Sequence, residues 1–409
     1  SSDGTVVAAG AYWNDGAGTN AGHVKVYEYT ITQPIIQNSV TITGTTLTDG
    51  TAILASGALT GNVTGDLTGN VTATTVTDGT ATLTSGTLTT NCIQYDDKSI
   101  IQANTITLVS GATTLNQLGD DIEGENANDY SGISVSLNSD GTIVAIGAHG
   151  NDGAGSDSGH VRVYWYDGDG WSQVGDDIDG ESGNDQSGYS VSLSSDGTIV
   201  AIGGWLNDDA GSDSGHVRVY EWDGISWNQL GDDIDGEAAS DQSGWSVSLS
   251  SDGTIVAIGA FFNDDAGSNA GHVRVYEYNG NNWNQLGDDI DGEAAGDQSG
   301  FWKGLSLSSD GTIVAIGAPY NDGGGGDSGH VRVYEWNGIS WNQLGDDIDG
   351  EAGSDQSGWS VSLSGDGTVV AIGARYNDGT ASAAGHVRVF KWDGTSWNIL
   401  TDSTGISGE

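Results

Sequence analysis

Large apolar residues alternate with serine in a segment that returns along most of the chain. One copy, at 244–249, reads Gly-Trp-Ser-Val-Ser-Leu, which is the pattern of a strand buried on one face. A Ser-Asp-Gly-Thr turn follows at 251–254, and Asp-Gly between two such runs is a strong hairpin signal. The next run, 255–260, is continuously apolar, as in a strand covered on both faces. These two runs predict an antiparallel strand pair.

The same unit contains two further predicted strands. Residues 272–278 alternate again, and a turn at Asn279-Gly280 leads to a fourth strand at 283–286. The fourth strand begins with a tryptophan that returns every 56 or 58 residues, and we expect it to pack between neighbouring units. The copies are Trp171, Trp227, Trp283, Trp341 and Trp397.

About six units of four antiparallel strands predict an all-β fold, a β-propeller with six four-stranded blades. A β-solenoid is the alternative fold. It fits less well, because the coils of solenoids are usually shorter and lack internal Asp-Gly hairpins. The second and third strands occur six times and the first strand only five times, so seven blades, completed by an upstream segment, are the alternative count. Residues 402–407 resemble the start of a first strand at 129–134. We therefore predict that residues 405–409 pair beside residues 4–10 and close the ring.

A segment rich in Thr and Gly interrupts the repeat. We expect the second and third strands of the first blade at 1–30, a Thr/Gly-rich β insertion at 31–113, and the remaining blades at 114–409, with ring closure against the N-terminus. The insertion contains its own duplication, 46–52 and 75–81. It is either a decorated hairpin lying on the propeller or an element that joins chains into a homo-oligomer or filament.

The charge balance excludes some partners. The chain has 57 acidic and 10 basic side chains, a formal net charge of −47. Nucleic-acid binding needs clustered Lys and Arg, so we exclude it. No apolar run approaches the roughly 18 residues of a membrane span. A surface this acidic repels itself unless salt or cations screen it, which favours an extracellular, cell-surface or virion-surface location.

The order of short motifs in each unit resembles a known family. Ser-Gly-x-Ser-Val, then Asp-Gly-x-x-Val-Ala-Ile-Gly-Ala-Pro, then Gly-x-Val-x-Val-Tyr is similar to FG-GAP repeats, the blades of integrin-α-type propellers; 317–319 and 329–334 give the closest copy. Two departures matter: the family's Phe-Gly is Ser243-Gly244 here, and its calcium loop is shortened to Ser-Ser-Asp-Gly, so that calcium site is not carried over. The insertion resembles the Thr/Gly-rich repeats of marine phage tail-fibre and other virion proteins.

Acidic loops after each fourth strand are candidates for calcium, because Asp-x-Asp-Gly turns supply several of the oxygen ligands that calcium prefers. The other interpretation is that these residues cap turns and keep the surface soluble. Both stay open. The candidate calcium ligands are Asp176, Asp177, Asp179, Asp232, Asp233, Asp235, Asp288, Asp289, Asp291, Asp346, Asp347 and Asp349.

One histidine and one cation recur in each unit. Because matching residues of different blades form a ring, we expect each histidine to bond a nearby loop carboxylate rather than to share one ion. The histidines are His23, His160, His216, His272, His330 and His386. The cation two residues later predicts a blade-to-blade ion pair. These cations are Lys25, Arg162, Arg218, Arg274, Arg332 and Arg388.

An active site needs one place that differs from the equivalent places in the other blades. Every carboxylate pair recurs in each blade, so we predict that the protein is not an enzyme. Aromatic residues in variable loop positions are the candidates for binding a glycan or a surface protein. The candidate residues are Trp205, Phe261, Phe262, Trp302, Tyr320 and Tyr376, and Phe301, Lys303 and Arg375 accompany them.

The function predicted is a non-catalytic extracellular or virion-surface propeller that acts as an adhesion or structural subunit of a fibre or appendage. One alternative is a secreted calcium-binding adhesin of a cell surface or matrix. The alternative from another class is a glycan-processing hydrolase of propeller fold.

Overall fold

The computed structural model describes residues 1, 4–31, 113–379, 381–400 and 406–407, and six short strands between residues 39 and 99. The chain divides into two compact units, Ser1–Glu28 with Gln117–Glu409, and Tyr29–Asn116. In the second unit β3 (Ser39–Ile42) pairs with β6 (Leu59–Asn62), β4 (Leu47–Thr48) with β5 (Thr51–Ala52), and β7 (Gln94–Tyr95) with β8 (Lys98–Ser99). The prediction that residues 31–113 join chains into a homo-oligomer or filament concerns a segment of which, beyond these six strands, the residues lie outside those described.

One sheet shows how each repeat folds. In the fourth sheet β21 (Ser246–Leu249), β22 (Ile255–Ala260), β23 (His272–Tyr278) and β24 (Trp283–Gln285) lie side by side, all antiparallel. These are the four predicted strands. A fifth strand, β25 (Ile290–Asp291), was not predicted; it pairs with the start of β23 while β24 pairs with its end. The bend between β24 and β25 turns the acidic loop toward the first residue of β23.

Four further sheets repeat this arrangement, and a sixth, the first along the chain, has four strands and lacks the first strand of the others; we number the six as blades 1 to 6 in chain order. Their strands are β1 (Val6–Ala11), β2 (His23–Ile31), β9 (Thr113–Gln117) and β10 (Ile122–Glu123) in blade 1; β11 (Ser134–Leu137), β12 (Ile143–Ala148), β13 (His160–Tyr166), β14 (Trp171–Gln173) and β15 (Ile178–Asp179) in blade 2; and β16 (Ser187–Leu193), β17 (Ile199–Gly204), β18 (His216–Trp222), β19 (Trp227–Gln229) and β20 (Ile234–Asp235) in blade 3. After blade 4 come β26 (Leu305–Leu307), β27 (Ile313–Ala318), β28 (His330–Trp336), β29 (Trp341–Gln343) and β30 (Ile348–Asp349) in blade 5, then β31 (Ser357–Leu363), β32 (Val369–Ala374), β33 (His386–Trp392), β34 (Trp397–Ile399) and β35 (Ile406–Ser407) in blade 6.

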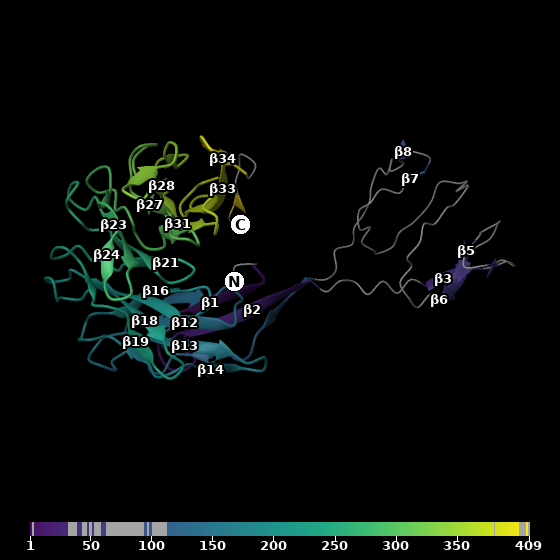
Figure 1. Cartoon of the computed structure of the whole chain (residues 1–409), viewed down its shortest axis with the longest axis horizontal. Helices are drawn as coiled ribbons and strands as arrows, with labels where there is room; N and C mark the ends of the chain where they lie inside the picture. The colour runs from purple at the N-terminus through teal and green to yellow at the C-terminus, as the bar shows by residue number, and fades with distance from the viewer. Residues whose placement is uncertain are drawn as a thin grey trace. The chain divides into compact units, whose positions relative to one another are not determined.

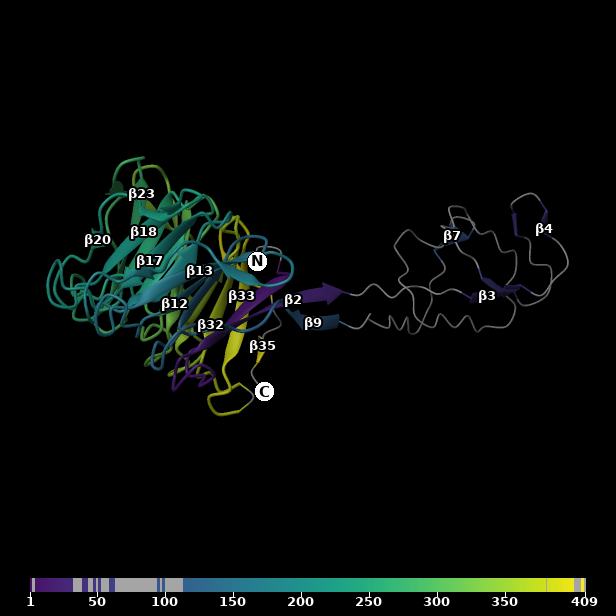
Figure 2. The same ribbon diagram turned by 90° about the horizontal axis from the view of Figure 1, so that it is seen from below.

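The blades follow one another around an axis. Figures 1 and 2 show the sheets fanning from β12 and β13 through β23 and β28 to β33. The first strands of blades 2 to 6 surround one cavity of about 190 Å³, to which they contribute Val135, Val191, Val247, Leu305 and Val361. A solenoid would stack these strands in a line. The protein is therefore an all-β propeller, and the described residues form six blades.

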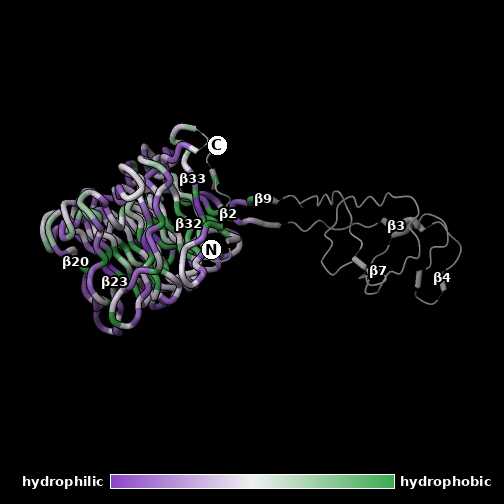
Figure 3. Tube along the Cα trace, turned by 90° about the horizontal axis from the view of Figure 1, so that it is seen from above, coloured by the Kyte–Doolittle hydropathy of each residue, from purple (hydrophilic) through white to green (hydrophobic). Residues whose placement is uncertain are grey.

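Apolar side chains fill the space between adjacent blades, and hydrophobic stretches lie inside the propeller while hydrophilic ones lie in its loops (Figure 3). Between blades 3 and 4, Val217 and Val219 of β18 pack against Val256 and Ile258 of β22. In blades 2 to 5 the second strand thus has its two faces against different neighbours, as its unbroken apolar run predicts. The repeated tryptophan also joins blades, as expected: Trp283 Nε1 donates a hydrogen bond to the carbonyl of Leu230 at 2.7 Å.

The Ser-Gly motif explains how closely the blades approach. Gly244 has a φ of +86°. Its carbonyl lies against Gly203 of blade 3, and a Cβ added to Gly203 would collide with that carbonyl. Ser190 Oγ donates a hydrogen bond of 2.7 Å to that same carbonyl. Glycine is needed at both positions because two backbones meet there.

The predicted ring closure is wrong. Ile406 and Ser407 form β35 and pair with Val387 and His386 of β33, not with residues 4–10. The equivalent pair in blade 5 is Ile348 and Asp349 on β28. Residues 406–409 read Ile-Ser-Gly-Glu and correspond in sequence to the Ile-Asp-Gly-Glu of the other blades. Ile406 and Ser407 form the fifth strand of blade 6 rather than a first strand for blade 1.

Blades 1 and 6 each have one sheet face that no neighbouring blade covers among the described residues. Val7 of β1 is 50% exposed and Val387 of β33 is 37% exposed, whereas Val144 and Val161, their counterparts in blade 2, are fully buried. Within the described residues, apolar clusters join five pairs of blades, and none joins blade 6 to blade 1.

Replacing Trp227 by alanine tests the packing between blades 2 and 3. Its ring packs against the cluster between these blades, and its Nε1 donates to the Val174 carbonyl at 2.9 Å. We expect Trp227→Ala to lower the free energy of unfolding by about 3 kcal/mol, less than for a fully buried ring. Urea denaturation measures this. Ile225→Ala is the matched control, because Ile225 is 84% exposed and its loss should change nothing; equal losses for both variants would contradict the packing role.

Candidate functional site

Aromatic side chains from several blades meet at one end of the central axis. Tyr189 and Trp245 lie near the starts of the first strands of blades 3 and 4, and Trp205 and Phe261 directly follow β17 and β22. The Trp245 ring lies with its centroid 4.6 Å from those of Tyr189 and Trp205, and 4.4 Å from that of Phe261. We call these four residues, together with Phe301, Trp302 and Trp359, the hub cluster.

An insertion found in blade 5 completes the hub cluster. Trp302 lies 5.3 Å from Tyr189 and 6.0 Å from Trp245 between ring centroids. Phe301 lies 5.0 Å from Phe261 and 4.8 Å from Trp359. Trp302 has a φ of +49°, a conformation that costs a bulky residue energy and occurs preferentially at functional sites. The insertion therefore marks one place where the propeller departs from its own symmetry.

All six predicted partner-binding residues lie in or beside the hub cluster. Trp205, Phe261 and Trp302 belong to it. Phe262 lies 3.9 Å from Phe261, and Tyr320 lies 6.0 Å from Phe301.

Tyr376 is connected to the hub cluster through a cation. Arg375 lies over the Trp359 ring at 3.1 Å and over the Tyr376 ring at 4.3 Å. Sequence reasoning missed Tyr189, Trp245 and Trp359, which were read only as strand residues. The sequence signal that could have identified them is the residue after each Ser-Gly, which varies among the blades. Residues that bind a partner can differ between blades, whereas residues that pack the blades together repeat.

The cavity beneath the hub cluster has few polar side chains. Its lining residues include Trp302, Lys303 and three serines of the first strands, and no Asp, Glu or His. At the hub the buried Trp245 Nε1 and Gln242 Oε1 have no hydrogen-bond partner. In blade 3 the matching Gln186 accepts a hydrogen bond from Trp205 at 3.0 Å, but Phe261 offers no such donor to Gln242.

The three aspartates of each acidic loop point to different places. The second one approaches the histidine that begins the third strand: Asp177, Asp233, Asp289 and Asp347 lie 3.4–3.7 Å from the nearest histidine Nδ1. The third uses its carbonyl instead, as Asp235 does in accepting a hydrogen bond of 2.7 Å from Arg274. Among the described residues, the groups suited to a metal ion contain the second aspartate and neither the first nor the third. One loop alone therefore does not surround a cation.

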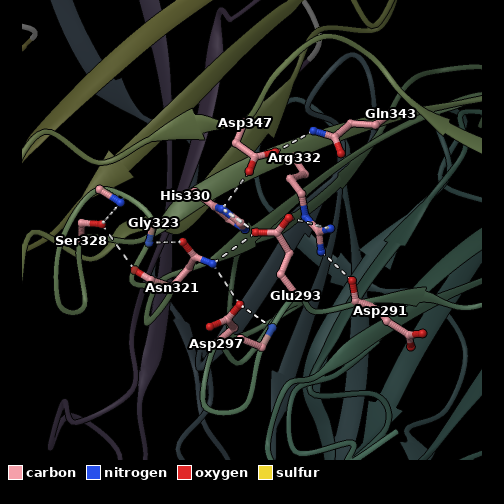
Figure 4. A network of polar contacts seen from close by, with 12 residues as sticks. Asp291, Glu293, Asp297, Asn321, Gly323, Ser328, His330, Arg332, Gln343 and Asp347 are labelled. Atoms are coloured by element: carbon pink, nitrogen blue, oxygen red, sulfur yellow. Dashed lines mark hydrogen bonds and ion pairs between the residues drawn. The ribbon is translucent and has the colours of Figure 1, made fainter. Parts of the chain in front are cut away.

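The histidines are held at the junctions between blades. His330 begins β28, and its Nδ1 lies 3.7 Å from Asp347 of its own blade and 3.7 Å from Glu293, which follows β25 of blade 4 (Figure 4). The expected carboxylate neighbours are present, but these distances exceed those of hydrogen bonds. As expected, each histidine lies in its own junction and the six do not converge.

Four of the recurring cations, Arg162, Arg218, Arg274 and Arg332, form the predicted ion pairs between blades, whereas Lys25 pairs with Asp121 of its own blade at 3.2 Å. Arg274 Nη1 lies 3.5 Å from Glu237, which follows β20 of blade 3. Burial lowers the pKa of His160, His272 and His330 to about 4. The contact with His216 holds the pKa of Asp233 at about 2. His160, His272 and His330 are therefore neutral at pH 7, and each keeps a lone pair on one ring nitrogen.

Comparison with known proteins identifies the repeat. Residues 123–164, 234–276 and 348–390 match the model of the FG-GAP repeat. Curated proteins give no match. Within the described residues, no helix is long and apolar enough to cross a membrane.

Solved structures give weak likenesses. Hydrazine synthase from Kuenenia stuttgartiensis is 12% identical over 69% of this chain and 68% of that one, with a TM-score of 0.41. A candidate 6-phosphogluconolactonase from Bacteroides uniformis is 9% identical over 72% of this chain and 89% of that one, with a TM-score of 0.42. A candidate TolB from Agrobacterium tumefaciens is 14% identical over 67% and 82%, with a TM-score of 0.40. Likenesses this weak say nothing about function.

Stability should fall on acidification because of the buried histidines. The folded pKa of His160, His272 and His330 is about 4, against 6.5 for a free imidazole. Below pH 6.5 these histidines are therefore protonated in the unfolded chain but remain neutral in the folded chain. The free energy of unfolding consequently falls between pH 6.5 and 4, by at most about 1.4 kcal/mol per pH unit for each histidine. Denaturation at pH 7, 6 and 5 measures this. Replacing the three by asparagine should reduce the slope without abolishing it, because burial also lowers the pKa of His149 to about 4 and lowers that of His386; a wild-type profile that is already flat would contradict the assignment.

Proposed function

We propose that this protein, a β-propeller built from FG-GAP repeats, is a non-catalytic binding subunit of an extracellular or virion-surface structure, and that it recognises a glycan at the hub cluster. The hub cluster is the observation that carries the proposal. The loops and junctions repeat from blade to blade, whereas the hub combines tyrosine, tryptophan and phenylalanine rings from blades 3 to 6 with the inserted Trp302. A binding site for one ligand needs such a departure from symmetry.

The chemistry of the hub cluster suits a sugar. Flat aromatic faces offer large apolar contact area at low conformational cost, and they stack against the C–H faces of pyranose rings. Lys303 is exposed beside Trp302, and Arg375 lies over Trp359 and Tyr376, so hydrogen-bond donors border the rings. The unsatisfied Trp245 Nε1 and Gln242 Oε1 are further polar groups at the hub that hydroxyl groups can pair with. Rings with polar neighbours favour a glycan over a purely apolar ligand.

The absence of catalysis is supported by where the carboxylates lie. Each junction carries its own Glu, His and Asp in similar geometry, and the hub cavity is lined by none of these residue types. Glycoside hydrolysis generally requires two carboxyl groups flanking one bond. The strongly acidic surface supports an environment that supplies salt or divalent cations. An adhesion or structural role follows from recognition without turnover.

A glycan array followed by calorimetry with the best ligand tests the proposal. Trp302→Ala should weaken binding at least tenfold, which corresponds to about 1.4 kcal/mol of lost contact, and should leave the melting temperature unchanged because Trp302 lies in an inserted loop. Trp165→Ala is the control, since Trp165 is 48% exposed on β13, away from the hub cluster. Equal binding by both variants, or release of reducing sugar from the bound glycan, would refute the proposal.

A further inference from the structure

Two junctions between blades bring together one more carboxylate than the others. Between blades 2 and 3 the group contains Glu181, Asp209, His216 and Asp233. Between blades 3 and 4 it contains Glu237, Asp265, His272 and Asp289. In each group one ligand atom from every residue lies within 4.8 Å of all the others.

The residues of each group come from separate parts of two blades. Glu237 follows β20 of blade 3, Asp265 lies in the loop between β22 and β23, His272 begins β23, and Asp289 lies between β24 and β25. The loop that carries Asp265 is fixed by its neighbour, since the Asp265 amide donates a hydrogen bond of 3.0 Å to Asn263 Oδ1. Four elements of known position therefore converge on one point.

The histidine in each group is buried and aimed at the carboxylates. His216 and His272 are each 1% exposed, and the Nδ1 atom of each has no hydrogen-bond partner. His272 Nδ1 lies 3.6 Å from Asp289 and 3.8 Å from Glu237. His216 Nδ1 lies 3.4 Å from Asp233 and 3.9 Å from Glu181.

These separations suit atoms that share one ion. They are too long for hydrogen bonds. Two ligands bound tetrahedrally to one ion at about 2.0–2.1 Å lie about 3.3–3.5 Å apart, so only small movements are needed. A bound ion would also provide the partner that a buried nitrogen otherwise lacks.

The charge at each junction favours a divalent cation. In each group three carboxylates face one imidazole, and the nearby cation is the arginine of the same strand. Arg274 Nη1 lies 3.5 Å from the other oxygen of Glu237, and Arg218 Nη1 lies 3.6 Å from Glu181. With one arginine against three carboxylates, two negative charges remain at each group.

We propose that these two groups are interblade sites for a divalent ion bound by one imidazole nitrogen and three carboxylate oxygens, and that the ion is Zn²⁺. Histidine and carboxylate are both zinc ligands, and four of them complete a closed structural site. Calcium prefers six to eight oxygens and has no use for the imidazole. Only Asp233 and Asp289 are shared with the calcium ligands expected from the sequence.

The chain contains its own reference junctions. Gly153 in blade 2 and Gly323 in blade 5 stand where Asp209 and Asp265 stand in blades 3 and 4. The corresponding groups, Glu125 with His160 and Asp177, and Glu293 with His330 and Asp347, have three ligands. These junctions show that glycine is compatible with the fold at this loop position.

Removing the two loop aspartates tests the proposal without endangering the fold. In calorimetric titration of chelator-treated protein with Zn²⁺, we expect two tight equivalents for the wild type and loss of both in the double variant Asp209→Gly with Asp265→Gly. Zn²⁺ should raise the melting temperature of the wild type and not that of the variant, because the ion links adjacent blades. Gly323→Asp should add a third equivalent.

Three outcomes would overturn the proposal. One is a wild type that binds no Zn²⁺. Another is a double variant that keeps the wild-type stoichiometry. The third is equal affinity for Ca²⁺ and Zn²⁺ with the same loss in the double variant, because that result would assign the sites to oxygen ligands alone. These measurements do not involve the hub cluster, so they are independent of glycan binding.

Discussion

Burial of both faces of each blade is the constraint on which the rest of the structure depends. A single sheet with apolar side chains on both faces is unstable alone, so blades 2 to 5 each pack between two neighbours. The closest approach is between backbones, at Gly203 and Gly244, and this forces small residues into the inner part of every blade. In the outer part, where the sheets lie farther apart, the repeated tryptophan donates its hydrogen bond across the junction.

The same constraint determines where chemistry can occur. Residues that hold neighbouring blades together must repeat, so the histidines and arginines of the third strands occur at junction after junction. Residues at the axis are free to differ, because the starts of the first strands meet only there. The hub cluster uses this freedom, with tyrosine, tryptophan and phenylalanine at matching positions. Repeated junctions thus support the scaffold while the axis supports recognition.

Local periodicity was enough to predict the four main strands, the two-sided burial of the second strand and the propeller. It was not enough for the fifth strand. Ile290 and Asp291 form only two pairs, and these exist because β24 leaves the start of β23 open. The closure of the ring was misassigned for a related reason: Ile406-Ser407 fits either kind of strand by pattern, and only pairing with β33 decides.

The candidate sites were predictable to different extents. The variable aromatic loops indicated half of the hub cluster, but the rings contributed by the first strands became visible only when the blades were placed around one axis. The junction groups could not be found from spacing. His272 and Glu237 belong to different blades, and they meet because the residue that follows β20 reaches across the junction to the start of β23.

The bare faces of Val7 and Val387 have a mechanical consequence. Blades 2 to 5 are supported on two sides, whereas the described residues of blades 1 and 6 are supported on one, so local opening costs least at the two ends of the row. The unit formed by residues 29–116 is inserted into the sequence of blade 1, after the start of β2 and before β10. A tensile load transmitted through that segment would therefore reach the propeller at a weakly supported blade, and the first response to force would be the loss of blade 1 rather than failure of the whole ring.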